Sequence, residues 1–253
     1  MRSWLILLTT ALMLAVPALS QDANTKKDEA TKNKSDERYT FKEEHDPNGI
    51  GKFYMGREIA HVMGHQAAGW LERKEREREE RPSALLKALN IREGDKVADI
   101  GAGSGYFTFR LAKLVGAKGK VYAVDIQQEM LDIMKKRMAK EKVTNVELIK
   151  GTETDPKLPV EGALDLVLMV DVYHEFSFPW EMTGCMVNAL KPGGRLVFVE
   201  YRMEDPKVPI KLVHKMSQAQ VKKEMESFRV THRQTIDVLP WQHIIIFEKN
   251  QDN

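Results

Sequence analysis

The chain has 253 residues, of which 42% are hydrophobic and 30% charged, so it can bury a hydrophobic core and is too apolar to be disordered throughout. Its formal net charge of +2 provides no strong long-range field, and we therefore expect no nucleic-acid partner. A single cysteine excludes a disulfide framework and a zinc site built from cysteines.

The amino-terminal residues have the pattern of a secretory signal peptide. Arg2 precedes an apolar run over 5–16, and Pro17 and small residues end the segment at Ser20. The alternative is an uncleaved membrane anchor, which is the weaker interpretation because the run is shorter than the roughly 20 residues that span a bilayer. We expect residues 1–20 to be removed, leaving a periplasmic or secreted protein without a stable membrane anchor.

Residues 21–38 contain alanine as their only apolar type and predict a disordered tether. Residues 39–82 predict a helical cap, because apolar residues recur every three or four positions over 53–71. This helix either covers a ligand site or simply packs against the rest of the protein. The mixed charges of 72–81 predict a solvated helix face with i,i+4 pairs, and a docking surface is the alternative.

From residue 83 onward, short apolar runs alternate with helical patterns. This alternation predicts an α/β fold with a doubly wound, mostly parallel sheet over 83–253. A hairpin formed by 229–236 and 243–248 closes the sheet, and Ser217 with Gln220 forms a capping box before a helix. The five earlier strands are predicted at 96–100, 120–125, 145–150, 164–170 and 195–200.

A glycine-rich loop follows the first of these strands. Gly101, Gly103 and Gly105 let the backbone turn tightly and let a ligand approach it closely. Their spacing differs from the GxGxxG fingerprint of pyrophosphate-binding loops, and no lysine follows as in a P-loop. Asp99 places a carboxylate near the loop, which favours a cationic ligand, and Asp125 at the end of the next strand can accept both hydroxyls of a ribose. Strand-end aspartates that merely keep the chain soluble are the alternative.

These residues resemble a known family. The run Asp-Ile-Gly-Ala-Gly-Ser-Gly-Tyr-Phe-Thr at 99–108, Val-Asp at 124–125 and Leu-Lys-Pro-Gly-Gly-Arg at 190–195 resemble the class I S-adenosylmethionine-dependent methyltransferases, in their small-molecule branch. The resemblance implies a seven-stranded Rossmann-like sheet in the order 3-2-1-4-5-7-6 with the last strand antiparallel. It also implies S-adenosyl-L-methionine as cofactor, with Gly101 and Gly103 near its methionyl part and Asp125 on its ribose.

The resemblance places the adenine beside the loop that follows the third strand. Many members of the family have Gly-Asp there, whereas this chain has Gly151-Thr152-Glu153. Either Thr152 or Glu153 is therefore expected to contact the adenine amine in place of that aspartate.

The segment after the fourth strand is expected to lie where donor and acceptor meet. Asp171 is expected to touch the donor, and His174 is either a general base or the source of an orienting hydrogen bond. Tyr173 and Glu175 are candidate walls of the acceptor pocket. The charged segment 200–215 either shapes the acceptor site or is an ordinary solvated loop.

We expect S-adenosylmethionine-dependent methyl transfer to a small molecule, directed to oxygen or carbon, by in-line displacement at the sulfonium methyl. A non-catalytic S-adenosylmethionine-binding protein is the main alternative, and an aminopropyl-transferring enzyme is a weaker one. No metal is expected, because His61, His65 and His214 lack the spacing of a zinc-binding set. The sequence leaves the oligomeric state open.

Overall fold

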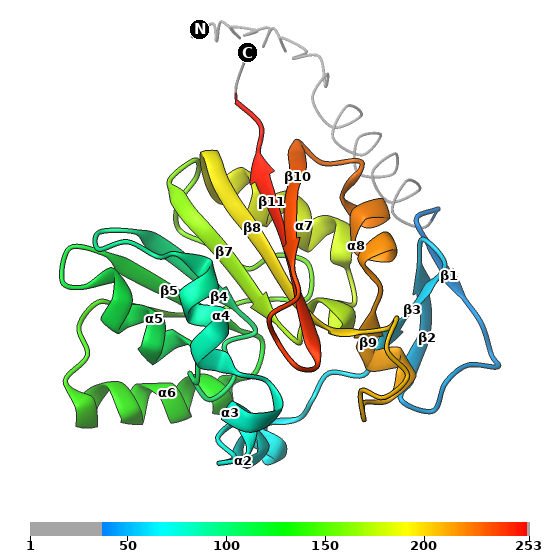
Figure 1. Ribbon diagram of the computed structural model, residues 1–253, viewed down its shortest axis with the longest axis horizontal. Coiled ribbons are helices and arrows are strands. Elements are labelled where there is room, and N and C mark those ends of the chain that lie inside the picture. The colour runs from blue at the N-terminus through cyan, green and yellow to red at the C-terminus, as the bar shows by residue number, and fades with distance from the viewer. Residues whose placement is uncertain (1–36, 252–253) are drawn as a thin grey trace, which may run out of the picture. The chain divides into compact units, whose positions relative to one another are not determined.

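The computed structural model describes residues 37–251 (Figure 1). The predicted signal peptide and all but the end of the predicted tether lie outside these residues. Contacts between residues divide the chain into two units, residues 1–40 and residues 41–253, and apart from residues 39 and 40 the fold described below is that of the second. Within 37–251, no helix combines the length and the hydrophobicity that crossing a membrane requires.

The central sheet has the predicted topology. Its main path runs β10-β11-β8-β7-β4-β5-β6, and the short strand β9 pairs with β8 outside this path. All neighbours on the path are parallel except the two pairs that contain β11. In order along the chain, the strands are β4 (Lys96–Ile100), β5 (Lys120–Asp125), β6 (Val146–Lys150), β7 (Leu164–Val170), β8 (Leu190–Arg202), β9 (Lys215–Met216), β10 (Val230–Ile236) and β11 (Gln242–Lys249).

Helices cover both faces of this sheet, which explains why the central strands are apolar along their whole length. One buried cluster joins the sheet to α4 (Pro82–Leu89), α5 (Thr108–Val115) and α6 (Gln128–Glu141). The other joins it to α7 (Pro179–Ala189) and α8 (Gln218–Met225). The capping box is confirmed in part: Ser217 Oγ accepts a hydrogen bond from the Gln220 N–H at 3.1 Å.

The predicted helical cap is wrong for most of residues 39–82. Within residues 37–251, the chain forms β1 (Tyr39–Phe41), β2 (Gly49–Tyr54) and β3 (Arg57–Ala60) before the first helix of this part begins. A tight turn joins β2 to β3, with φ of 50° at Met55 and 97° at Gly56. Such positive φ values end a helix, so the apolar spacing over 53–71 is divided between a hairpin and short helical turns. These turns are η1 (His65–Ala67), α2 (Ala68–Leu71) and α3 (Arg76–Glu79).

A buried ion pair fixes the β2–β3 hairpin beside α8, where Figure 1 shows them as neighbours. Arg57 Nε lies 2.9 Å from Glu224 Oε1, and Arg57 Nη2 donates to Glu224 Oε2 at 3.1 Å. The remaining guanidinium nitrogen, Nη1, donates to the carbonyl of His174 at 3.1 Å. The hairpin therefore holds in place the backbone that follows β7.

Candidate active site

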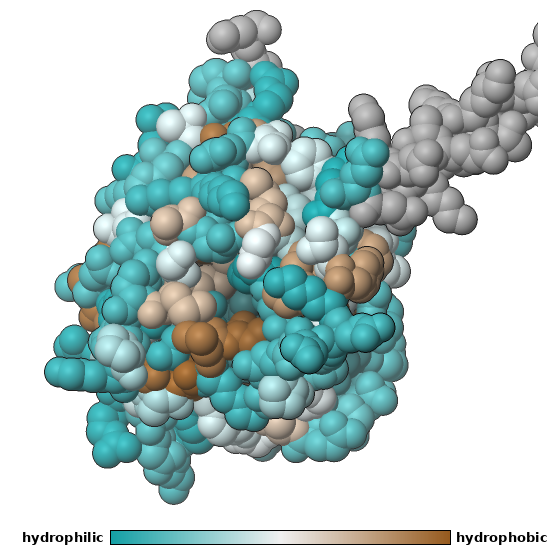
Figure 2. Space-filling model, turned by 90° about the vertical axis from the view of Figure 1, so that its right-hand side faces the viewer, coloured by the Kyte–Doolittle hydropathy of each residue, from teal (hydrophilic) through white to brown (hydrophobic). Residues whose placement is uncertain are grey.

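A cavity of about 430 Å³ opens at the carboxyl ends of the parallel strands, where ligands of doubly wound folds bind. Its walls come from the segments after β4, β5, β6, β7 and β8, together with residues from the segment 62–76. Val62 and Trp70 on that segment are about 40% exposed, so apolar side chains reach the surface beside the cavity. Figure 2 shows hydrophobic side chains gathered in the lower part of a largely hydrophilic face.

Two of the three predicted glycines line the cavity. Gly101 and Gly103 have φ of 69° and 56°, and both belong to its wall. A Cβ on Gly103 would lie 2.6 Å from Leu71 Cδ1, and one on Gly101 would lie 2.4 Å from Val172 Cγ2. Gly105 has a different role, since a Cβ there would lie 2.5 Å from the buried ring of Phe109. The first two glycines keep the cavity wall free of side chains, and the third lets α5 pack against the loop.

Asp125 lies on the cavity wall and braces the glycine loop. Its Oδ2 accepts the Gly103 N–H at 2.9 Å, and its Oδ1 accepts the Gln127 N–H at 2.8 Å. Burial raises the pKa of this carboxyl, although both backbone N–H groups favour its ionised form. A carboxylate offers about four lone-pair sites, so each oxygen can accept a further hydrogen bond from a ligand hydroxyl.

Asp99 is not on the cavity wall, contrary to its predicted place beside the ligand. Its Oδ2 accepts a hydrogen bond from Thr108 Oγ1 at 2.6 Å, and the residue is 3% exposed. Burial raises the pKa of Asp99 to about 6, with a smaller contribution from the negative charge of Asp125. Side chains of a strand alternate between its two faces, so Asp99 shares a face with Val97 and points toward α5. We assign it a supporting role under the loop.

Thr152 and Glu153 both line the cavity, as predicted for the loop after β6. The Thr152 hydroxyl is engaged in a local turn, in which its Oγ1 accepts the Asp155 N–H at 3.0 Å. Gln127 also lines this region, where its Oε1 accepts the His65 N–H at 2.8 Å and its Nε2 donates to the carbonyl of Met63 at 2.9 Å. Gln127 ties the segment 62–76 to the end of β5, a role that no local sequence pattern indicated.

Asp171 lines the cavity in a strained left-handed conformation, with φ of 52°. Its Oδ2 accepts a hydrogen bond from Gln242 Nε2 at 3.0 Å, while its Oδ1 is buried and has no protein partner. Burial, with the negative charges of Glu80 and Glu200 nearby, raises the pKa of Asp171 well above its usual value. An unpartnered polar atom in the wall of a cavity is suited to bind a ligand.

A chain of hydrogen bonds runs from the end of β8 into the cavity wall. Glu200 Oε2 lies 2.6 Å from His174 Nδ1, and His174 Nε2 lies 3.1 Å from His214 Nδ1. The other oxygen of Glu200 accepts the Tyr173 N–H at 3.0 Å, which fixes the carboxyl in place. Burial lowers the pKa of both imidazoles to about 4 and raises that of Glu200 to about 8. Both histidines are therefore neutral at pH 7.

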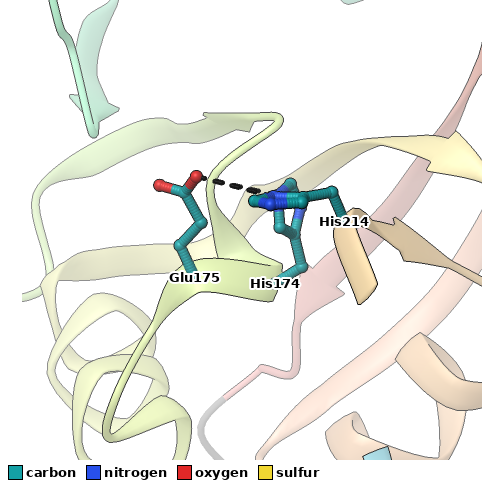
Figure 3. A group of neighbouring side chains, drawn as sticks. All are labelled: His174, Glu175 and His214. Atoms are coloured by element: carbon teal, nitrogen blue, oxygen red, sulfur yellow. Dashed lines mark hydrogen bonds and ion pairs between the residues drawn. The ribbon is translucent and has the colours of Figure 1, made fainter. Parts of the chain in front are cut away.

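Glu175 completes this group of side chains on the cavity wall (Figure 3). Its Oε1 lies 3.8 Å from His214 Nδ1 and 4.0 Å from His174 Nε2, and it accepts the Met63 N–H at 3.2 Å. Burial raises the pKa of Glu175 to about 7. We call His174, Glu175 and His214 the His–Glu cluster. Its members belong to η2 (Tyr173–Glu175) and η3 (Leu212–His214).

Tyr173 does not line the cavity, although we predicted it as a wall of the acceptor pocket. It is 0% exposed and packs edge-on against Phe198 at 4.9 Å and Phe176 at 5.4 Å between ring centroids. The turn of η2 points His174 and Glu175 into the cavity and directs Tyr173 into the core beneath them.

The charged segment 72–81 is not simply a solvated face. Arg76 and Glu80 are each 3% exposed, and Arg76 Nε donates to Glu80 Oε2 at 2.7 Å. The guanidinium of Arg76 lies over the Tyr106 ring at 4.3 Å, and Arg76 also lines the cavity. Tyr201 donates its hydroxyl to Glu80 at 3.0 Å, which connects this pair to the end of β8. The predicted i,i+4 ion pair is therefore present between Arg76 and Glu80, but it is buried beside the cavity and does not lie on a solvated face.

No sequence pattern groups Glu200 and His214 with His174. Glu200 lies near the carboxyl end of a strand, as Asp125 does, and that position was a usable signal. His214 had none, because its imidazole reaches the cavity through a loop and a single turn of η3.

The cavity fits a phosphate-free nucleoside with a cationic tail. Two glycines leave part of its wall without side chains, and two acidic residues, Asp125 and Asp171, belong to the same wall. Asp171 Oδ1 has no protein partner. Among the positively charged residues of this wall, Arg76 lies nearest to the glycine loop in sequence. Its guanidinium is already paired with the Glu80 carboxylate.

Comparisons with known proteins agree with this geometry. The sequence pattern of the family described as "Methyltransferase domain" matches residues 91–250. The ubiquinone/menaquinone biosynthesis C-methyltransferase UbiE of Francisella philomiragia is 30% identical over 126 residues, which are 49% of each chain. The protein-L-isoaspartate O-methyltransferase of Methanococcus aeolicus is 33% identical over 113 residues, or 45% of this chain and 49% of that protein. The chain thus spans about half the length of these curated relatives.

Solved structures share the fold. A SAM-dependent methyltransferase from Aquifex aeolicus superposes with a TM-score of 0.68 at 26% identity, over 74% of this chain and 99% of that chain. A putative type 11 methyltransferase from Sulfolobus solfataricus gives a TM-score of 0.56 at 19% identity, over 68% and 94% of the two chains, and supports the fold alone. The strand order, the glycine loop and the family match together establish that this chain belongs to the methyltransferase-domain family of class I S-adenosylmethionine-dependent enzymes.

Proposed function

We propose that this protein methylates a small molecule at an oxygen or carbon atom that becomes nucleophilic when the molecule loses a proton. The observation that carries this proposal is the His–Glu cluster, a buried polar group in the wall of the cavity that contains the glycine loop. Relatives named as C- and O-methyltransferases support the same chemistry.

S-adenosylmethionine, when bound, supplies a methyl group on a positively charged sulfur. Asp125 would accept the ribose hydroxyls, and Gly101 and Gly103 would let the methionyl part approach the backbone. Thr152 and Glu153 would border the adenine, while Asp171 Oδ1 would form a hydrogen bond with the ligand. The apolar residues that the segment 62–76 contributes to the cavity wall would limit the access of water.

The His–Glu cluster would receive the proton that the acceptor gives up. Glu175, with a pKa of about 7, is partly ionised at neutral pH, which is the range in which a general base is most effective. The neutral imidazoles of His174 and His214 can each accept or donate a hydrogen bond, depending on the tautomer. Glu200 holds His174 in one orientation through the 2.6 Å contact.

The test has two stages. Calorimetry with S-adenosylhomocysteine measures the cofactor site, and transfer of a labelled methyl group to a panel of phenols, hydroquinones and enolisable ketones measures catalysis. We expect Glu175→Gln to lower kcat by about 10²- to 10⁴-fold, the usual contribution of a general base, while binding S-adenosylhomocysteine like the unaltered protein. His232→Gln, a change on β10 outside the cavity, is the matched control.

Binding of S-adenosylhomocysteine without transfer to any class of acceptor would refute the proposal and favour the non-catalytic alternative. Equal kcat values for the Glu175→Gln and His232→Gln variants would refute the assigned role of the cluster.

We also propose that the protein is exported. Support comes from the signal-peptide pattern of residues 1–20 alone. Immunodetection in periplasmic, cytosolic and membrane fractions tests the proposal, and a mature amino terminus at Gln21 is the expected result. Full-length protein confined to the cytosol would refute it.

A further inference from the structure

The His–Glu cluster has the composition and the spacing of a metal-binding site. Among residues 37–251, it is the one group of three or more histidine, cysteine, aspartate or glutamate side chains whose ligand atoms lie within 4.8 Å of one another. Figure 3 shows the Glu175 carboxylate directed toward the two imidazoles. Two imidazoles and a carboxylate are the three protein ligands of many catalytic zinc sites, in which the fourth position stays open.

The distances within the cluster suit an ion of this size. His174 Nε2, His214 Nδ1 and Glu175 Oε1 form a triangle with sides of 3.1, 3.8 and 4.0 Å. A point in the plane of this triangle lies about 2.1 Å from all three atoms, which is the usual Zn–N or Zn–O bond length. Small movements of the side chains would bring the ion out of the plane and give it tetrahedral geometry.

The surroundings of the cluster also match a metal site. Glu200 contacts the far nitrogen of His174 at 2.6 Å, which is the carboxylate–histidine arrangement that orients a ligand imidazole. Without an ion, His174 Nε2 and His214 Nδ1 form a hydrogen bond of 3.1 Å. An ion bound between them would take the place of the proton in this hydrogen bond.

We propose that His174, Glu175 and His214 bind a divalent transition metal ion, with Zn²⁺ as the best match, and that its open position faces the cavity. This inference rests on the proposed function and names its acceptor class, which is a molecule with a hydroxyl or enol oxygen. With the ion bound, the ligand atoms of the cluster no longer accept the proton of the acceptor, so the acceptor oxygen binds the ion, loses its proton to water and keeps the electron pair. The resulting anion attacks the methyl carbon of S-adenosylmethionine and forms a new bond to it. The carbon–sulfur bond breaks at the same time, and its electron pair stays on the sulfur.

The test measures metal binding independently of activity. Untagged protein is treated with a chelator and dialysed. It is then titrated with Co²⁺ while the absorption of a four-coordinate Co²⁺ site is followed, and Zn²⁺ is added last as a competitor. We expect one equivalent to bind and Zn²⁺ to displace it. His214→Ala should abolish the absorption, and Glu200→Gln should weaken Co²⁺ binding about 10- to 100-fold, as changes behind a ligand do.

His232→Ala is the matched control, because it removes an imidazole that is not near the cluster. Binding of Co²⁺ that is unchanged in His214→Ala, or no binding by the unaltered protein, would overturn the metal site. S-adenosylhomocysteine calorimetry on the same samples separates the two proposals. Cofactor binding with methyl transfer at full rate in the chelator-treated protein would overturn the metal site and leave the proposed function standing.

Discussion

The carboxylate of Asp125 provides the sharpest test of how this site is built. Both of its oxygens accept a backbone N–H, from Gly103 at 2.9 Å and from Gln127 at 2.8 Å. In Asp125→Asn, one oxygen becomes an amide NH₂ group that faces an N–H donor. One of the two hydrogen bonds is then lost, and a buried donor is left without a partner.

The cost of this change can be worked from those contacts. A buried donor without a partner costs about 1–3 kcal/mol, and each kcal/mol lowers Tm by roughly 2–4 °C in a domain of about this size. A hydrogen bond from a ribose hydroxyl to a carboxylate contributes about 1.5–3 kcal/mol to binding, so S-adenosylhomocysteine should bind about 10- to 150-fold more weakly.

Thermal unfolding and calorimetry with S-adenosylhomocysteine measure the two effects separately. Asp132→Asn, on the exposed face of α6, makes the same chemical change where the carboxylate accepts only a side-chain hydrogen bond from Gln128 at 3.0 Å. We expect that control to keep its Tm and its affinity. A folded Asp125→Asn protein that binds as tightly as the unaltered one would refute the assignment of Asp125 to the ribose.

Three further predictions concern stability. Gly105→Ala should destabilise the protein by about 1–3 kcal/mol more than Gly94→Ala, because both glycines have positive φ but only Gly105 faces packed side chains. Glu224→Gln should cost about 3–5 kcal/mol, because it leaves the buried Arg57 guanidinium without its counter-charge. Asp99, whose folded pKa of about 6 lies above its usual value, holds its proton more tightly in the folded state. The free energy of unfolding should therefore fall as pH rises from about 4 to above 6, by about 3 kcal/mol from this group, and Asp99→Asn should remove that part.

Urea unfolding at several pH values measures all three effects. Equal stabilities of the two glycine variants would show that packing around Gly105 is loose. A Glu224→Gln protein as stable as the original would mean that the ion pair does not hold the hairpin. A pH dependence that is identical with and without Asp99 would mean that this carboxyl does not hold its proton more tightly in the folded state than in the unfolded state.

Several features could be predicted from the sequence because their signals are local. Apolar runs bounded by turn residues marked the strands from β4 to β8, since a strand covered on both faces is apolar along its length. The glycine loop required backbone conformations that favour glycine, and Gly101 and Gly103 have them. The strand-end position of Asp125 placed it at the ligand-binding edge of the sheet.

Predictions from local patterns were wrong where the same spacing of apolar residues occurs in more than one kind of structure. Residues 53–71 have apolar side chains at helical intervals, but the turn at Gly56 divides them between a hairpin and short helices. Asp99 precedes the loop by two residues, and only the direction of its side chain, toward α5, shows that it supports the loop from below.

The sequence alone determined the fold family and the cofactor, because these depend on short segments whose backbone conformation their own residues specify. The tertiary structure alone decided which side chains form the His–Glu cluster. Glu200 and His214 lie 26 and 40 residues from His174 in the chain, and they meet it because β8 pairs beside β7 and the following loop returns over the cavity. No local rule encodes such distant contacts, since they depend on how the whole sheet places the ends of its strands.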